Sequence, residues 1–162
     1  MENYFNALEV MEMAKDIEKN GKKFYLIHAK ATDNLELKEL FHKLAEAQDD
    51  HYQKFVELTE ELKGNSDKSD YLYDEEVSAY FDYLVELTIF PAYDSEKSKE
   101  ALNDAKKALD LAIRAEKDAI LFYREMCANN SGETIEAVEK LIKEKKSHLR
   151  ELGKYIEEYV KK

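Results

Sequence analysis

One pattern of eight residues occurs twice in the chain, at positions 18–25 and 116–123. Both copies read Glu-x-x-(Gly or Ala)-x-x-Phe-Tyr, and each is followed at nearly the same distance by a single histidine, His51 or His148. Each half of the sequence therefore supplies one carboxylate and one imidazole. In a helical bundle such groups converge from facing helices, so the repeat predicts two similar halves that meet around one shared core.

The composition favours helices throughout. The 162 residues fit one domain that can bury a core, and they include a single proline and four glycines. Glu, Lys, Leu and Ala are abundant and are good helix formers, whereas a sheet-rich fold needs more frequent turn residues. The sequence predicts an all-α fold.

Charge and cysteine content exclude several classes of protein. The net charge of −11 argues against nucleic-acid binding, which needs a surplus of Lys and Arg. Cys127 is the only cysteine, so no internal disulfide can form. No apolar stretch is long enough to span a bilayer, and the start of the chain does not read as a signal peptide. We expect a cytoplasmic protein without a membrane partner.

Four long segments have helical periodicity. They cover about 4–30, 35–63, 103–128 and 133–160 of a single domain spanning 1–162, and a long crossover at 64–102 separates the second from the third. Within the crossover we expect one shorter helix near 74–88 and a break at Phe90-Pro91. This order predicts two αα-hairpins packed as a four-helix bundle.

Glu18 and Glu116 lie on the apolar sides of their helices. A buried ionised carboxylate costs several kcal/mol unless a metal, a cation or a proton compensates it. The alternative is that both helices are rotated slightly, so that the carboxylates reach solvent. Tyr25 and Tyr123 lie seven residues further on, where we expect each to pack with its hydroxyl on a carboxylate.

With these residues the chain resembles the ferritin-like superfamily, specifically its rubrerythrin-type branch without a rubredoxin domain. The resemblance implies two irons held by one Glu from each of helices one and three and by Glu-x-x-His from each of helices two and four. It also implies peroxide or oxygen chemistry by an oxidoreductase that needs an external electron donor. Glu18, Glu116, His51 and His148 match that ligand pattern.

Two of the implied carboxylates are missing. Gln48 stands three residues before His51, and Lys145 stands three residues before His148. An ammonium cannot coordinate a metal, so a family-style iron pair would lack anionic ligands. Lys145 could instead act as an internal counter-ion whose head lies between Glu18 and Glu116.

A single metal ion offers another arrangement. Glu144 and His148 are four residues apart on one helix, and such a pair can bind one metal. The predicted mononuclear site uses Glu18, Glu116, Glu144 and His148, with His51 nearby. The rival interpretation of His51 is a core histidine satisfied by hydrogen bonds.

Two functions follow from these alternatives. The first is an iron-binding protein with an altered, mononuclear or low-affinity site. The second is a metal-free bundle that acts as a scaffold or partner-binding protein. We also expect a homodimer, because the crossover is rich in aromatic residues that would pack on the bundle or on a second subunit: Tyr71, Tyr73, Tyr80, Phe81, Tyr83, Phe90 and Tyr93. His28 and His42 are expected at the surface or at a bundle end, without a role.

Overall fold

The computed structural model describes residues 7–64, 89–92, 94–128 and 132–160. All regular structure within these ranges is helical, which confirms the predicted all-α, ferritin-like four-helix bundle. The four long helices are α1 (Ala7–Ala31), α2 (Leu35–Gly64), α5 (Ala105–Ala128) and α6 (Glu133–Tyr155). The short α4 (Glu96–Ala101) precedes α5, and the π-helical segment η2 (Ile156–Val160) extends α6.

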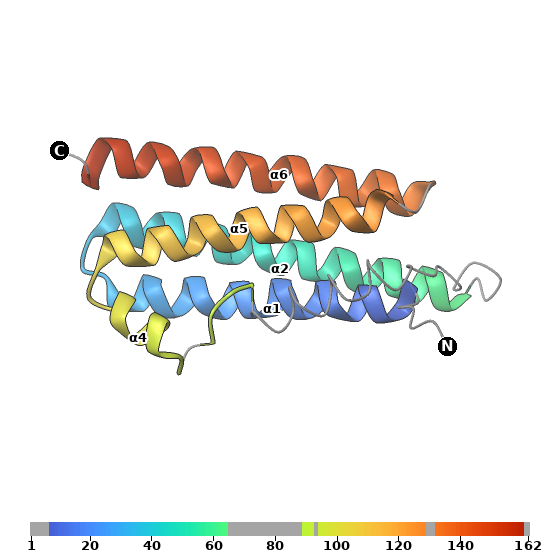
Figure 1. Ribbon diagram of the computed structural model, residues 1–162, viewed down its shortest axis with the longest axis horizontal. Helices are drawn as coiled ribbons and strands as arrows, with labels where there is room; N and C mark the ends of the chain where they lie inside the picture. The colour runs from blue at the N-terminus through green and yellow to red at the C-terminus, as the bar shows by residue number, and fades with distance from the viewer. Residues whose placement is uncertain (1–6, 65–88, 93, 129–131, 161–162) are drawn as a thin grey trace.

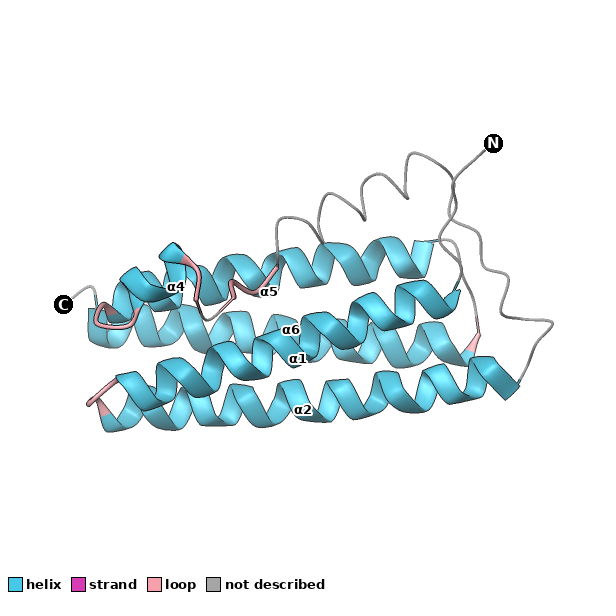
Figure 2. Ribbon diagram, turned by 90° about the horizontal axis from the view of Figure 1, so that it is seen from below, coloured by secondary structure: helices cyan, strands magenta, loops and turns pink. Residues whose placement is uncertain are grey.

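The long helices lie side by side as two antiparallel pairs, α1 with α2 and α5 with α6 (Figures 1 and 2). The end of α2 lies at one end of the bundle, whereas α4 lies toward the other end, the end at which α1 passes into α2 (Figure 1). The end of α2 and the start of α5 therefore lie at opposite ends of the bundle, as two hairpins sharing one core require (Figure 1).

The crossover contains α4, which the sequence analysis did not predict. Six residues are too few to show a helical period. Its start has a local cause, because the Ser95 hydroxyl accepts a hydrogen bond from the Ser98 backbone N–H at 3.2 Å. The helix predicted near 74–88 lies outside the described residues, as do all the aromatic residues of the predicted cluster except Phe90.

Side-chain caps determine where two helices begin. Asn34 Oδ1 accepts from the Leu37 N–H at 3.0 Å, and Asp104 Oδ1 accepts from the Lys107 N–H at 3.2 Å. Both contacts are N-caps, which satisfy backbone donors that lack a partner in the first turn. Asp104 is one of the two residues, Asn103 and Asp104, from which the sequence predicts the cap of the third long helix, and α5 accordingly starts at Ala105, close to the start expected near 103.

The apolar sides of the four helices form one core. Its largest side chains are aromatic, and Phe24, Phe41, Phe55 and Phe122 are each 2 % exposed or less. Phe90 closes the core from the crossover, with its ring centroid 5.8 Å from that of Phe24. Halfway along the bundle this apolar core is interrupted by a polar cluster.

Candidate functional site

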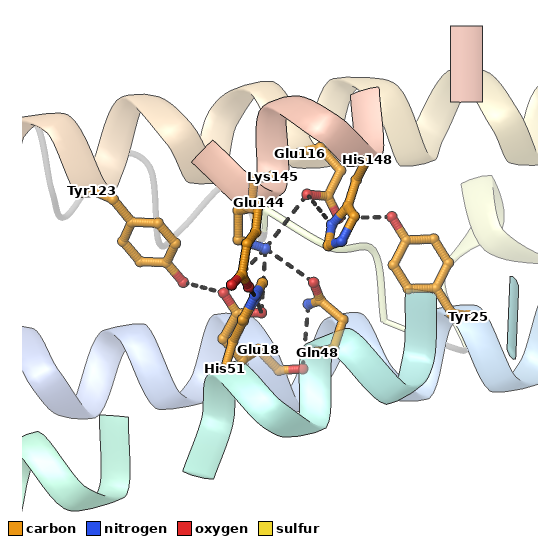
Figure 3. A network of polar contacts seen from close by, with 9 residues as sticks. All are labelled: Glu18, Tyr25, Gln48, His51, Glu116, Tyr123, Glu144, Lys145 and His148. Atoms are coloured by element: carbon orange, nitrogen blue, oxygen red, sulfur yellow. Dashed lines mark hydrogen bonds and ion pairs between the residues drawn. The ribbon is translucent and has the colours of Figure 1, made fainter. Parts of the chain in front are cut away.

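Polar side chains from all four long helices meet inside the bundle (Figure 3). The two carboxylates of the repeat, Glu18 on α1 and Glu116 on α5, have no exposed surface (0 %), which excludes the alternative in which they reach solvent. The other members of the cluster are also buried: Gln48, His51, Lys145 and His148. All of these residues lie on the sides of their helices that face the core, so burial of the apolar residues brings them together.

The Lys145 ammonium occupies the centre of the cluster (Figure 3). Its Nζ lies 3.1 Å from Oε1 and 3.2 Å from Oε2 of Glu18. The same atom lies 3.4 Å from Glu116 Oε2 and 2.9 Å from Gln48 Oε1. An ammonium has three N–H donors, and three side chains accept from it here. The lysine needs no solvent to satisfy its hydrogen bonds.

The charges of the cluster stabilise one another. Burial alone would lower the pKa of Lys145, but the carboxylates of Glu116 and Glu18 outweigh burial and raise it above its usual value. Burial also opposes ionisation of the two glutamates. The Lys145 charge nevertheless lowers the pKa of Glu18, and it lowers that of Glu116 to about 2. One cation and two anions therefore persist at neutral pH.

Gln48 is held in place from α1. Its Nε2 donates to the Glu18 backbone carbonyl at 3.5 Å, and this orientation turns Oε1 toward Lys145. The amide fits because Gly21 has no side chain. A Cβ at Gly21 would collide with the Gln48 amide nitrogen and would lie 2.9 Å from Phe90 Cε2. The glycine in the first copy of the repeat thus makes room for the glutamine.

The two tyrosines of the repeat bond across the hairpins. Tyr123 on α5 donates to Glu18 Oε1 at 2.6 Å, and Tyr25 on α1 donates to Glu116 Oε1 at 2.8 Å. Burial and the neighbouring carboxylates raise the pKa of both hydroxyls well above the usual value, so both remain protonated donors. The expected bond between hydroxyl and carboxylate is present, and it joins each tyrosine to the opposite half of the repeat.

The two histidines stack beside the carboxylates. Their ring centroids are 5.9 Å apart, with 25° between the planes. His51 Nδ1 lies 3.7 Å from Glu18 Oε2, and His148 Nδ1 lies 3.9 Å from Glu116 Oε2. These distances exceed a hydrogen bond, and both Nδ1 atoms are buried without a hydrogen-bond partner.

Glu144 connects the cluster to the surface. The sequence predicts that Glu144 and His148, which lie on the same helix, bind one metal ion together. In the structure, Glu144 Oε2 instead lies 2.6 Å from His51 Nε2 on α2. The Glu144 side chain is 45 % exposed, whereas that of His51 is 2 % exposed. Burial opposes a charged ring, yet the Glu18 and Glu144 carboxylates raise the pKa of His51. One nitrogen of His51 is therefore satisfied by the exposed Glu144, and the other remains unpaired inside the bundle.

The residues present do not fit a pair of irons. Among the described residues, Glu18 and Glu116 are the only carboxylates at the centre of the cluster. Gln48 is neutral, and the Lys145 ammonium lies within 3.4 Å of both acids. An iron pair would have to share that space with a cation. In the part of the chain that the structure describes, no three His, Cys, Asp or Glu side chains are grouped so as to hold a metal ion.

Four helices around buried carboxylates and histidines define the class, which is the ferritin-like bundle. The rubrerythrin family model matches residues 9–108, and the chain belongs to the rubrerythrin family. A crystal structure of a ferritin-like diiron-carboxylate protein from Thermotoga maritima is similar to this chain, with a TM-score of 0.75 and 24 % identity. That alignment covers 96 % of this chain and 97 % of the other chain. A search of curated proteins gives no match. The family relationship suggests a capacity for iron binding. No helix in the described ranges is long and apolar enough to cross a membrane.

Two features of the site were not predicted from the sequence. The first is the dependence of Gln48 on Gly21, for which the sequence carries one signal. The copy of the repeat that contains Gly21 is followed by a histidine, His51, that has Gln48 three residues before it. The other copy has Ala119 at the equivalent position, and the residue three before its histidine is Lys145. The second is that each tyrosine of the repeat donates to the glutamate of the other hairpin. This pairing depends on how the two hairpins pack, and residue spacing does not indicate it.

Proposed function

We propose that this protein is a metal-independent member of the rubrerythrin family, in which the Lys145 ammonium takes the place of the metal ions, and that it acts as a scaffold or partner-binding bundle. The observation that carries the proposal is the position of Lys145 Nζ, within 3.4 Å of both Glu18 and Glu116. An ammonium at this point supplies the positive charge that the two buried acids need.

The hydrogen bonds around the cluster support the same conclusion. The tyrosines donate to one oxygen of each glutamate, and Lys145 donates to both glutamates and to Gln48. A buried ion cluster of this kind adds little net stability, because removing charges from water offsets most of their attraction. Its effect is to fix how the four helices align, since any other register would leave a charge unpaired.

The same groups disfavour two-electron peroxide chemistry. The Lys145 ammonium cannot be oxidised or reduced as a metal ion can. The tyrosines around it stay protonated at neutral pH, and the two glutamates stay ionised. What these residues do is bind one another, exclude water and orient the helices. The surface of the bundle is then the part that remains available for a partner.

Metal analysis of protein produced in iron-rich medium tests the proposal. We expect less than about 0.1 iron, manganese or zinc per chain, with no rise in melting temperature on adding Fe(II), because a ligand that binds only the folded state must stabilise it. The matched control is the double variant Gln48→Glu/Lys145→Glu, which restores four central carboxylates and should bind two irons. Stoichiometric metal in the unmodified protein would overturn the proposal.

A second candidate function is binding of one divalent ion, iron in the first instance, at an altered site. The observation that favours it is that the Nδ1 atoms of His51 and His148 are buried, unpaired and close to carboxylates. Imidazole and carboxylate together suit iron or zinc. Such an ion would be held by Glu18, His51, Glu116 and His148 once Lys145 had moved away, and any redox chemistry would need an external electron donor. Titration with Fe(II) or Zn(II) distinguishes the two candidates. The second candidate predicts that one ion binds per chain and that the double variant His51→Ala/His148→Ala binds none, whereas the first predicts no binding.

A further inference from the structure

A row of cations lies on the outer side of each of the helices α5 and α6. On α5, Lys117 and Arg124 are seven residues apart, which places them two turns apart on one side of the helix. On α6, Lys143, Lys146 and Arg150 follow one line at spacings of three and four residues. All five residues are exposed, and together we call them the basic face. Neither the repeat nor the ion cluster explains why they gather there.

The two rows lie beside each other. The helices α5 and α6 pack together and run in opposite directions (Figures 1 and 2). Lys145 on α6 reaches Glu116 on α5, with 3.4 Å between Nζ and Oε2. The next residues of the two helices, Lys146 and Lys117, therefore lie at one level of the bundle.

The neighbours of these two lysines show which way they point. Glu144 contacts His51 on α2, and a helix turns about 100° per residue, so Lys146 is turned away from α2 toward α5. On α5, Asp118 lines a cavity with residues of the crossover. Lys117 is turned by about 100° from Asp118, to the side of α5 that borders α6. The basic face is therefore one surface rather than two.

The cations of the basic face have no ion-pair partner among the described residues. Other surface lysines do pair with a described acid: Lys15, Lys22, Lys43, Lys54, Lys63 and Lys154. Lys146 and Arg150 are also four residues apart on one helix, a spacing at which like charges destabilise it. Helix stability therefore does not account for the row, whereas a bound anion would relieve its repulsion.

An exposed apolar side chain lies within the basic face. Leu121 is 44 % exposed, and it lies one turn from Lys117 and from Arg124 on the same side of α5. The face also contains two of the three arginines of the chain, Arg124 and Arg150. An arginine fork binds a carboxylate through two parallel hydrogen bonds. The face thus suits a ligand that offers carboxylates beside an apolar group.

Length and charge select the kind of ligand. The row from Lys143 to Arg150 is about 10 Å long at 1.5 Å per residue, which matches a short peptide segment. The whole chain has a net charge of −11, so its remaining surface repels long polyanions such as a DNA duplex or an anionic bilayer. A segment with only a few carboxylates is repelled less and still meets the cations.

We propose that the basic face binds a short acidic segment of another protein, whose carboxylates pair with the cations while an apolar side chain packs against Leu121. Clusters of basic residues recognise acidic motifs in this way. The inference names the class of partner for the partner-binding bundle proposed above, and it rests on that function.

Fluorescence anisotropy with a labelled peptide of the repeating sequence Glu-Glu-Leu tests the inference on the full-length protein. The matched probe is the same peptide with glutamine in place of every glutamate. We expect saturable binding of the acidic peptide that weakens as salt is added, and at least tenfold weaker binding of the glutamine peptide. No saturation by the acidic peptide, or equal binding of the two peptides, refutes the inference.

Charge-matched variants locate the binding. Lys146→Glu/Arg150→Glu reverses two cations of the basic face and should weaken binding of the acidic peptide at least tenfold. Lys19→Glu/Lys23→Glu reverses two exposed lysines of α1, changes the net charge equally and should weaken binding less than threefold. Equal losses in the two variants would mean unspecific attraction and contradict the site. If the first variant does not fold, Lys146→Gln/Arg150→Gln decides the question.

Other ligands of the basic face are separate outcomes. A DNA duplex or a phosphatidylserine vesicle that binds more tightly than the peptide would contradict the inference. Self-association of the protein that Lys146→Glu/Arg150→Glu abolishes would assign the face to a second copy and contradict it as well. The metal content of the same sample is an independent readout. A metal-free protein that does not bind the peptide rejects this partner alone, whereas stoichiometric metal rejects the proposed function itself.

Discussion

Replacement of Lys145 by methionine removes the only cation that contacts both central acids in the described structure. Methionine has nearly the same length, so the packing changes little while the charge disappears. Glu18 and Glu116 would then face each other with no positive neighbour between them. Breaking a buried ion pair by removing one partner costs about 3 to 5 kcal/mol of folding free energy.

The size of this loss also follows from the protonation of one acid. At pH 7 the variant can avoid an unpaired charge by keeping Glu116 neutral, although the same group ionises in the unfolded chain with an ordinary pKa of 4.5. Holding a proton 2.5 pH units above that value costs about 3.4 kcal/mol at 1.36 kcal/mol per unit. The two routes agree, and we expect a loss of about 3 to 4 kcal/mol at pH 7.

The pH dependence gives a sharper signature than the loss itself. In the variant, one buried carboxyl holds its proton at pH 7, whereas the same carboxyl in the unfolded chain releases it above pH 4.5. The folded variant therefore gains stability as the pH falls toward 4.5, by about 2.7 kcal/mol between pH 7 and pH 5. In the unmodified protein both glutamates have lowered pKa values. Their contribution is fully present above pH 4.5 and is lost as the pH falls toward about 2, the folded pKa of Glu116. The pKa of Lys145 is raised, so its contribution is fully present below the usual value of 10.5 and is lost as the pH rises from there through the raised folded-state pKa.

Urea denaturation of both proteins between pH 5 and pH 8 measures these effects. Lys146→Met, an exposed neighbour on the same helix, is the control and should change stability by about 0.5 kcal/mol or less. The triple variant Glu18→Gln/Glu116→Gln/Lys145→Met should recover much of the loss and lose the pH dependence. The reasoning is refuted if Lys145→Met is as stable as the unmodified protein at pH 7, or if its deficit does not shrink on acidification.

Three further predictions concern the supports of the cluster and the assembly. Gly21→Ala should destabilise the fold by about 1 to 3 kcal/mol through the collision with Gln48, despite the gain of about 1 kcal/mol in helix propensity, and a more stable variant in urea denaturation would contradict this packing. Tyr123→Phe removes a hydrogen bond to the Glu18 carboxylate and should cost about 1.5 to 3 kcal/mol by the same assay, whereas an unchanged midpoint would mean that the bond contributes nothing. The predicted homodimer should sediment at twice the 19.0 kDa of one chain, and a monomer at micromolar concentration would remove that expectation.

Much of the fold could be predicted because helix period and repeat spacing are local properties. The positions of Glu18 and Glu116 on the apolar sides of their helices favoured burial over exposure of both acids, and both are buried. The short helix α4 could not be found, because six residues cannot show a period and its start depends on a single serine cap. Residue spacing also could not predict that Glu144 contacts His51 on another helix, because spacing describes only neighbours on the same helix, such as His148.

The sequence by itself determined which groups the core must contain, since two repeated carboxylates, two histidines, a glutamine and a lysine all lie on apolar helix faces. Only the tertiary structure decided how they pair. The alignment of the hairpins placed the Lys145 ammonium within hydrogen-bond reach of both acids and exchanged the tyrosine hydroxyls between the halves. It also left the Nδ1 atoms of both histidines unpaired. These contacts join residues up to 127 positions apart in sequence, and their free energy depends on distances that only the packed bundle fixes.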